Sequence, residues 1–165
     1  MNTEKDSFLH LARHPVRFRM FLLSRLPSAY FSGLRIRDLD ENRCLVTVPY
    51  KWFSKNPFHS TYFACLGMAA EMSTGALAMA RVYKRTPTLS MLVVKMEADF
   101  FKKADGLTSF LCNDGKLIED TIQKAITSGE GQSVRISSSG TNQKGELVAE
   151  FFITWSFKVK KPKQG

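Results

Sequence analysis

Cysteine is scarce in this sequence, and its few residues form no recognisable site. The three cysteines, Cys44, Cys65 and Cys112, are odd in number, far apart and without a CxxC spacing. A disulfide framework needs paired cysteines, and a structural zinc site needs closely spaced ligands. The sequence therefore favours three buried, reduced thiols and no metal site.

A long uncharged apolar run is also missing. No such run approaches the ~20 residues that a membrane-spanning helix needs. The opening residues, MNTEKD, are polar and mixed in charge, unlike a targeting segment. We therefore expect no transmembrane segment and a cytoplasmic location.

Negative charge is in short supply. Lysine and arginine number 24 against 15 acidic residues, which gives a net charge of +9. This excess raises nucleic acid, anionic membranes and phosphorylated ligands as partners. The cations gather in N-terminal arginines and in a basic tail at 160–165, without interleaved aromatics or the signature of a nucleic-acid module. We therefore expect no nucleic-acid partner.

The remaining composition is that of one globular domain. The chain has 165 residues, of which 44% are apolar and 24% charged. That length suffices to bury a sizeable core. We expect a single domain over residues 1–165.

The central element is a long helix predicted at 60–83, rich in Ala, Met and Leu. Asn56-Pro57 precedes it, and Ser60 or Thr61 is the expected N-cap. Small residues recur along one face at steps of three and four, so another backbone can approach closely. Because the other positions are apolar too, we expect a sheet to wrap around this helix.

Glu71 is the one formally charged residue between Lys55 and Arg81. Burying a carboxylate without a partner costs several kcal/mol, so such an acid must be paired, protonated or beside a hydrated cavity. One interpretation is a structural Glu bonded to a neighbouring backbone group or arginine. The other is a general base or nucleophile with a raised pKa.

Other segments complete an α+β pattern in which an antiparallel sheet wraps the central helix. A basic amphipathic helix, interrupted near His14-Pro15, is predicted at 7–26, and we expect it to cover the domain's own surface rather than a membrane. A short helix is predicted at 116–127. Strands are predicted at 33–50 (as a pair or one long bent strand), 88–101, 107–113, 133–138 and 147–159.

Two motifs carry a resemblance to a known family. The run Asn56-Pro57-Phe58-His59-Ser60 leads into Glu71, and the segment MEADFFKKA follows at 96–104. Together they resemble the hotdog-fold thioesterase superfamily, near the phenylacetate-pathway and 4-hydroxybenzoyl-CoA thioesterases. The resemblance covers about Leu26 to Val159.

The resemblance implies a hotdog fold and homodimers joined edge to edge, often paired into tetramers. An acyl-CoA or acyl-carrier-protein thioester would bind at the subunit interface, with coenzyme A as part of the substrate and no separate cofactor. The thioester carbonyl would face the start of the central helix, where backbone N–H groups stabilise a developing oxyanion.

The same resemblance assigns roles to individual residues. Glu71 would activate water or attack directly, and Asn56 or Ser60 would position the water or substrate. Oxyanion donors would lie around Ser60, Thr61 and Tyr62. His59 would donate a hydrogen bond to the carbonyl, or else serve as a packed aromatic residue.

One departure from the family pattern is visible at the helix start. This chain has His59-Ser60-Thr61 where many active relatives have His-Gly-Gly. Without both glycines, a substrate cannot approach the backbone as closely. A non-catalytic module that binds acyl thioesters or carrier protein is therefore the second hypothesis, beside a thioesterase.

The basic residues acquire a role under either hypothesis. Lys102, Lys103, Arg135 and the tail lysines are candidates to contact the phosphates of coenzyme A or an acidic carrier protein. A generally solvated basic surface is the alternative. A third, weaker hypothesis is a protein that associates with membrane or nucleic acid through its two basic ends.

Overall fold

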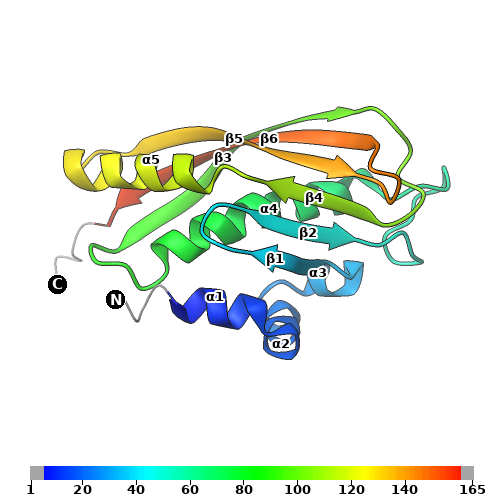
Figure 1. Cartoon of the computed structure of the whole chain (residues 1–165), viewed down its shortest axis with the longest axis horizontal. Coiled ribbons are helices and arrows are strands. Elements are labelled where there is room, and N and C mark those ends of the chain that lie inside the picture. Colours follow the sequence, from blue (N-terminus) through cyan, green and yellow to red (C-terminus); the bar gives the residue numbers. More distant parts are fainter. Residues whose placement is uncertain (1–5, 161–165) are drawn as a thin grey trace.

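The computed structural model describes residues 6–160. Along this range, helices alternate with pairs of strands, and all the strands belong to one sheet (Figure 1). The elements are α1 (Asp6–Arg13), α2 (Pro15–Arg25), α3 (Pro27–Ser32), β1 (Arg35–Leu39), β2 (Cys44–Val48), α4 (Phe63–Val82), β3 (Leu89–Phe100), β4 (Thr108–Cys112), α5 (Gly115–Ser128), β5 (Gln132–Thr141) and β6 (Leu147–Val159).

The six strands form one antiparallel sheet in the order β1-β2-β4-β5-β6-β3. The predicted α+β architecture, an antiparallel sheet around a long central helix, is confirmed. β1 and β3 lie at opposite edges of this sheet. β3 pairs with β6 over most of its length, so its other side carries unpaired backbone groups.

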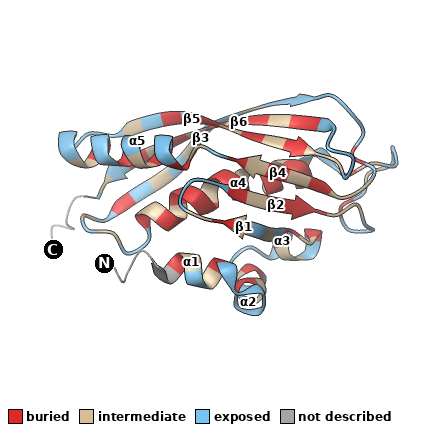
Figure 2. Ribbon diagram, viewed as in Figure 1, coloured by how far each residue is buried: buried red, intermediate tan, exposed pale blue. Residues whose placement is uncertain are grey.

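The sheet packs against α4, which forms the centre of the core (Figure 2). Hydrogen bonds tie the helix to the strands. The indole N–H of Trp155 on β6 donates to the Thr74 hydroxyl at 3.0 Å, and Ser73 and Ser138 on β5 share a hydrogen bond of 2.7 Å. By length and composition alone α4 is able to cross a membrane, but 61% of its apolar window is buried inside the protein, as in a core helix.

The start of α4 differs from the prediction. The helix begins at Phe63, with Tyr62 rather than Ser60 or Thr61 as N-cap. Thr61 is held in an extended conformation because it bridges to Lys55 and its N–H donates to the Ala104 carbonyl at 2.7 Å. These tertiary bonds override the local capping preference.

The N-terminal segment is helical as predicted, but in three pieces. The break falls at His14, which caps α2 by accepting a hydrogen bond from the Arg17 N–H at 3.4 Å. The sequence prediction ended this helix at Leu26 and missed α3, which starts with Pro27 at its first position and ends at Gly33, whose φ is +81°. The predicted basic tail at 160–165 lies outside the described residues beyond Lys160.

The later elements follow the predicted order. β6 spans Leu147–Val159, and α5 spans Gly115–Ser128 against the predicted 116–127. β5 is longer than predicted because it continues to Thr141 and pairs with β4. The three cysteines are free and buried.

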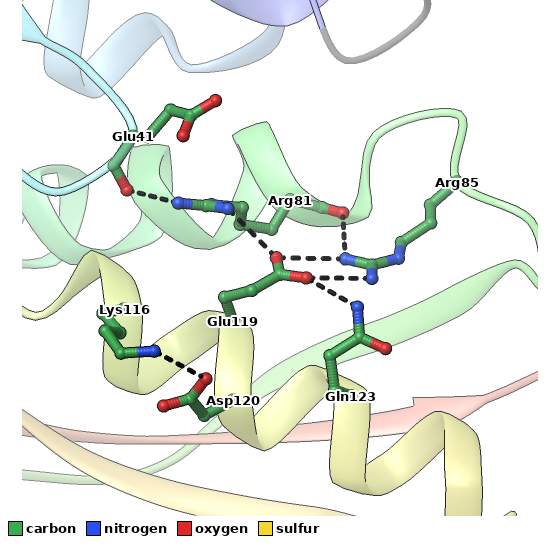
Figure 3. Close-up of polar contacts among 7 residues, drawn as sticks. All are labelled: Glu41, Arg81, Arg85, Lys116, Glu119, Asp120 and Gln123. Carbon is green, nitrogen blue, oxygen red and sulfur yellow. Dashed lines mark hydrogen bonds and ion pairs between the residues drawn. The ribbon is translucent and has the colours of Figure 1, made fainter. Parts of the chain in front are cut away.

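A charge cluster fastens the far end of α4 (Figure 3). The Glu119 carboxylate on α5 lies between Arg81 and Arg85, at 3.2 and 3.0 Å, and Arg81 also donates to the Glu41 carbonyl in the β1–β2 turn. Burial raises the pKa of Glu119, but hydrogen bonds from Arg85 and Gln123 and the two arginine charges outweigh it and lower the pKa to about 2. The cluster joins α4, α5 and the β1–β2 turn.

Candidate active site

The loop before α4 is organised by Asn56. Its side-chain oxygen accepts hydrogen bonds from the Phe58 N–H at 3.0 Å, and from the N–H and hydroxyl of Ser60, both at 3.2 Å. The Asn56 backbone N–H also donates to the Ser60 carbonyl at 2.9 Å. Asn56 thus holds the loop, and Ser60 is one of the groups that it holds.

The backbone donors expected at the helix start are already engaged. The Ser60 N–H donates to Asn56, the Thr61 N–H to Ala104, and the Tyr62 N–H to the Ser54 carbonyl at 2.7 Å. The expectation that these three backbone N–H groups serve as oxyanion donors is not met in this conformation. The physical reason is that the loop pairs with its neighbours before the helix begins.

Two other backbone N–H groups are free at the start of α4. Among residues 6–160, no acceptor is hydrogen-bonded to the N–H of Phe63 or Ala64, the first two residues of α4. Unpaired N–H groups at a helix start carry the positive end of the helix dipole and can bind a developing negative charge. Sequence reasoning missed these residues because any residue type can supply a free backbone N–H.

A groove of about 620 Å³ opens at this helix start. One wall comes from the Asn56 loop and the first turns of α4, including Phe63 and Leu66. The other comes from residues 100–104, which are the last residue of β3 and the segment that follows it. The hydroxyl of Thr61, a lining residue, is buried and has no hydrogen-bond partner within the described chain.

Of the other predicted site residues in this region, the two lysines line the groove and His59 does not. Lys102 and Lys103 line the groove, and Lys102 also pairs with Glu146 at 2.6 Å. His59 is exposed in the loop, with a φ of +58°, and is not among the residues that line the groove.

The structure separates Arg135 from the two lysines. Trp155 faces α4, and its cross-strand neighbour Val134 shares that face, so Arg135 points to the opposite face of the sheet. There Arg135 pairs with Glu97 at 3.1 Å and covers the Phe152 ring at 3.8 Å. Within one chain, Arg135 therefore does not join Lys102 and Lys103 in a single anion site.

Glu71 lies two turns along α4 from the helix start, on the side that faces β6 and β3. Its helical neighbours on this side, Gly67 and Gly75, lie against Phe151 and Trp155. The Glu71 carboxylate makes no hydrogen bond or ion pair with any residue in the described range. Its burial, without a compensating charge, raises the pKa of the carboxyl group.

The surface beside Glu71 is unusually apolar for a sheet edge. Met96 and Phe100 on β3 point to the α4 side but are 43% and 51% exposed. Phe63 at the start of α4 is exposed as well. Such an open apolar surface with one unpaired acid is typical of an interface or a binding site.

No group of three or more His, Cys, Asp or Glu side chains that is arranged to hold a metal ion occurs in residues 6–160. The helix start offers free backbone donors and an apolar groove, and the Glu71 carboxylate lies farther along α4, outside the residues that line the groove. This combination suits acid–base or acyl-transfer chemistry.

Solved structures share this architecture, the hotdog fold. A Pseudomonas aeruginosa protein, described as of unknown function and a probable thioesterase, has 22% identity and a TM-score of 0.75, covering 88% of this chain and 97% of its own. A Chlorobaculum tepidum protein of unknown function has 14% identity and a TM-score of 0.73, with coverages of 88% and 97%. A Haemophilus influenzae thioesterase has 10% identity and a TM-score of 0.63, with coverages of 91% and 94%. At these identities the likeness shows the fold.

Comparison by sequence gives a family. None of the curated proteins compared with this chain matches it significantly. The sequence pattern of the family described as "domain of unknown function (DUF4442)" matches residues 16–157. Because this match spans most of the chain, the protein belongs to the DUF4442 family.

Proposed function

We propose that the protein is a thioesterase that hydrolyses an acyl-CoA or acyl-carrier-protein thioester, with Glu71 as the general base. The observation that carries this proposal is the Glu71 carboxylate, which is partly buried, has a raised pKa and lacks a partner in the described chain. A raised pKa brings a carboxylate closer to the range in which it accepts a proton efficiently near neutral pH.

The groove at the start of α4 suits the rest of such a substrate. Its apolar walls fit an acyl or pantetheine chain. Lys102 and Lys103 at its rim are placed to attract the phosphates of coenzyme A or an acidic carrier protein. In one protomer Arg135 lies on the other face of the sheet, so we leave it out of this site.

The free N–H groups of Phe63 and Ala64 are the proposed oxyanion donors. When water attacks a thioester carbonyl, its oxygen acquires negative charge, which the N–H groups and the helix dipole stabilise. Glu71 takes the proton from the attacking water, and the thiolate of coenzyme A or of phosphopantetheine leaves. Asn56 contributes indirectly, because it fixes the loop that leads into these donors.

We further propose that the working site forms in a homodimer. β3 is an unpaired edge strand, and the exposed Met96 and Phe100 beside it would be covered by a second copy. Edge-to-edge pairing of two β3 strands would satisfy their free backbone groups. We also propose that such dimers can pair into a tetramer. Analytical ultracentrifugation gives the mass that distinguishes the two states.

Helix geometry favours a site shared between protomers. Phe63 and Glu71 are eight residues apart, which corresponds to ~12 Å along the axis of α4. The Glu71 carboxylate lies toward Gly75, away from Phe63. A carbonyl held by the Phe63 N–H is therefore better reached by Glu71 of a second copy.

A non-catalytic module that binds acyl thioesters or carrier protein is the second candidate. It is favoured by the helix start, where three backbone N–H groups are engaged and Ser60 and Thr61 stand where many active relatives of the resembled family have glycines. Such a module would bind acyl-CoA tightly without releasing thiol.

The test is a thiol-release assay combined with calorimetric binding, on short, medium, long and aromatic acyl-CoAs. Aromatic substrates come first because of the resemblance to the phenylacetate-pathway and 4-hydroxybenzoyl-CoA thioesterases. Turnover of at least one substrate is the expected result. Binding without turnover across the panel, by a folded protein, would instead support the second candidate.

A further inference from the structure

Helix α2 has two apolar faces, and only one of them is used by the fold. Phe18 and Leu22 are buried against the domain. On the opposite side, Val16, Met20 and Leu23 follow one another at steps of four and three and are 65%, 61% and 39% exposed. In Figure 2 much of α2 is coloured as exposed, at the margin of the molecule. A helix that only covers its own domain has no need of the second face.

Exposed aromatic residues on α3 and in the loop after β2 lie near α2, because Arg19 on α2 stacks on the Tyr30 ring, which contacts Phe31. Phe31 on α3 lies 5.9 Å from Phe53, and Phe53 lies 6.4 Å from Trp52, measured between ring centroids. All three rings are exposed, and Trp52 is 80% exposed. We call these six residues the α2 face: Val16, Met20, Leu23, Phe31, Trp52 and Phe53.

Cations flank the α2 face. Arg17 and Arg19 lie on either side of the apolar line on α2, and the Arg19 guanidinium sits 4.5 Å from the Tyr30 ring centre, next to Phe31. Behind them, two adjoining grooves of about 380 and 260 Å³ share Arg19, Arg35 and Arg37. Lys51 lines the second groove.

These cations are available for an external anion. None of Arg17, Arg19, Arg35, Arg37 and Lys51 forms an ion pair with a carboxylate in the described part of the chain. Asp38 also lines the first groove, but its carboxylate pairs with Arg43 at 2.7 Å.

We propose that the α2 face docks the protein onto a membrane surface of anionic phospholipids. Apolar and aromatic side chains enter the region between headgroups and acyl chains, and the flanking cations meet the lipid phosphates. A helix that presents an apolar line between arginines has the chemistry of an interfacial helix, and an exposed tryptophan suits the same depth.

The charge of the α2 face favours an anionic membrane over a second copy of the protein as its partner. Two copies facing each other through the α2 face would bring their unpaired arginines together, which is unfavourable. An anionic bilayer instead offers both opposite charge and an apolar layer. The α2 face also lies on the β1 side of the sheet, opposite β3, so it stays free in the proposed dimer. This inference does not depend on the thioesterase proposal.

The test is sedimentation of the full chain with vesicles of phosphatidylcholine alone or mixed with phosphatidylglycerol. The double variant Met20→Glu/Leu23→Glu removes the centre of the α2 face without touching a buried residue. The matched control is Leu117→Glu, an exposed leucine on α5. We expect the wild type and the control to bind the anionic vesicles, more weakly at high salt, and the double variant to bind about tenfold less or worse.

Tryptophan fluorescence reports insertion directly. Trp52 is exposed and Trp155, the other tryptophan, is buried, so a blue shift on adding vesicles reports Trp52 entering an apolar layer. Three outcomes would overturn the proposal: no binding of the folded wild type to anionic vesicles, equal binding by the double variant and the control, or binding without a shift in Trp52 emission. Self-association that the double variant abolishes, without vesicle binding, would assign the α2 face to a second copy instead.

Discussion

The carboxylate of Glu71 lies directly against Gly75, one helical turn later in α4. A Cβ atom on residue 75 would stand only 3.0 Å from Glu71 Oε1 and 3.2 Å from the Trp155 ring. The ring is fixed by its hydrogen bond to Thr74, so the flexible carboxylate is the group that must move. The glycine therefore reserves the space in which the proposed base sits.

Gly75→Ala is expected to lower turnover while leaving stability within ~1 kcal/mol of wild type. Alanine favours a helix by about 1 kcal/mol over glycine, which offsets the crowding. Gly67→Ala is the matched control, because its Cβ would meet Phe151 at an ordinary 3.5 Å. Thiol-release rates and urea unfolding of both variants check this. Equal rates in the two variants would show that the carboxylate position does not matter.

Phe63→Pro is expected to lower kcat by a factor of about 10² to 10³, the usual cost of losing one oxyanion donor. Proline lacks the N–H but fits the first position of a helix, and Tyr62 before it already has a ψ of 133°, as proline requires. Phe63→Ala loses the ring and keeps the N–H. A comparison of the two variants therefore separates loss of the N–H donor from loss of the ring. A proline variant as active as the alanine variant would remove Phe63 from the mechanism.

Glu119→Gln is expected to destabilise the fold by about 2 kcal/mol, because Arg81 and Arg85 lose the charge that compensates them in a largely buried site. The two arginines and Gln123 lower the pKa of Glu119 from its ordinary value of 4.5 to about 2. The contribution of ionised Glu119 to the free energy of unfolding is therefore present above about pH 4.5 and is lost as the pH falls toward 2.

Thermal unfolding across this pH range measures the effect. The wild type should lose more stability than Glu119→Gln as the solution is acidified. Asp120→Asn is the control (Figure 3), since its pair with Lys116 is exposed and should contribute less than ~0.5 kcal/mol. A loss at Asp120 as large as that at Glu119 would contradict this account of the cluster.

Met96→Glu is expected to convert the proposed dimer to a monomer and to abolish thiol release, because two carboxylates would meet in its buried apolar interface. Analytical ultracentrifugation gives the mass, and Leu117→Glu is again the control for an exposed apolar side chain. An active monomer would refute the shared site.

Mixing inactive variants tests the sharing itself. If Glu71 acts across the interface, mixed dimers of Glu71→Gln and Phe63→Pro contain one intact site, and a refolded equal mixture should regain about a quarter of wild-type activity. If each site lies within one protomer, the mixture stays as inactive as the separate variants.

The sequence predicted the long elements well. The apolar composition of 60–83, the strand pattern of 88–101 and the run at 147–159 have strong local signals, and they became α4, β3 and β6. Glu71 stood out because it was the one formal charge between Lys55 and Arg81, and the structure leaves its carboxylate without a partner in the described residues and with a pKa raised by burial.

The details of the site were not predictable because they depend on contacts distant in sequence. The bond from the Thr61 N–H to Ala104 delays the start of α4 and moves the free donors to Phe63 and Ala64. Arg135 was grouped with Lys102 by charge alone, whereas the strand register puts it on the other face of the sheet. Neither effect has a signature in residue types.

The most direct test of the central claim compares thiol release by wild type and Glu71→Gln across pH, with circular dichroism to confirm folding. The base must be deprotonated, so the raised pKa predicts a wild-type rate that increases with pH to above the ordinary range of a glutamate. Glu71→Gln should lose at least about a hundredfold in kcat and this pH dependence. A folded Glu71→Gln variant that hydrolyses at the wild-type rate would show that Glu71 is structural.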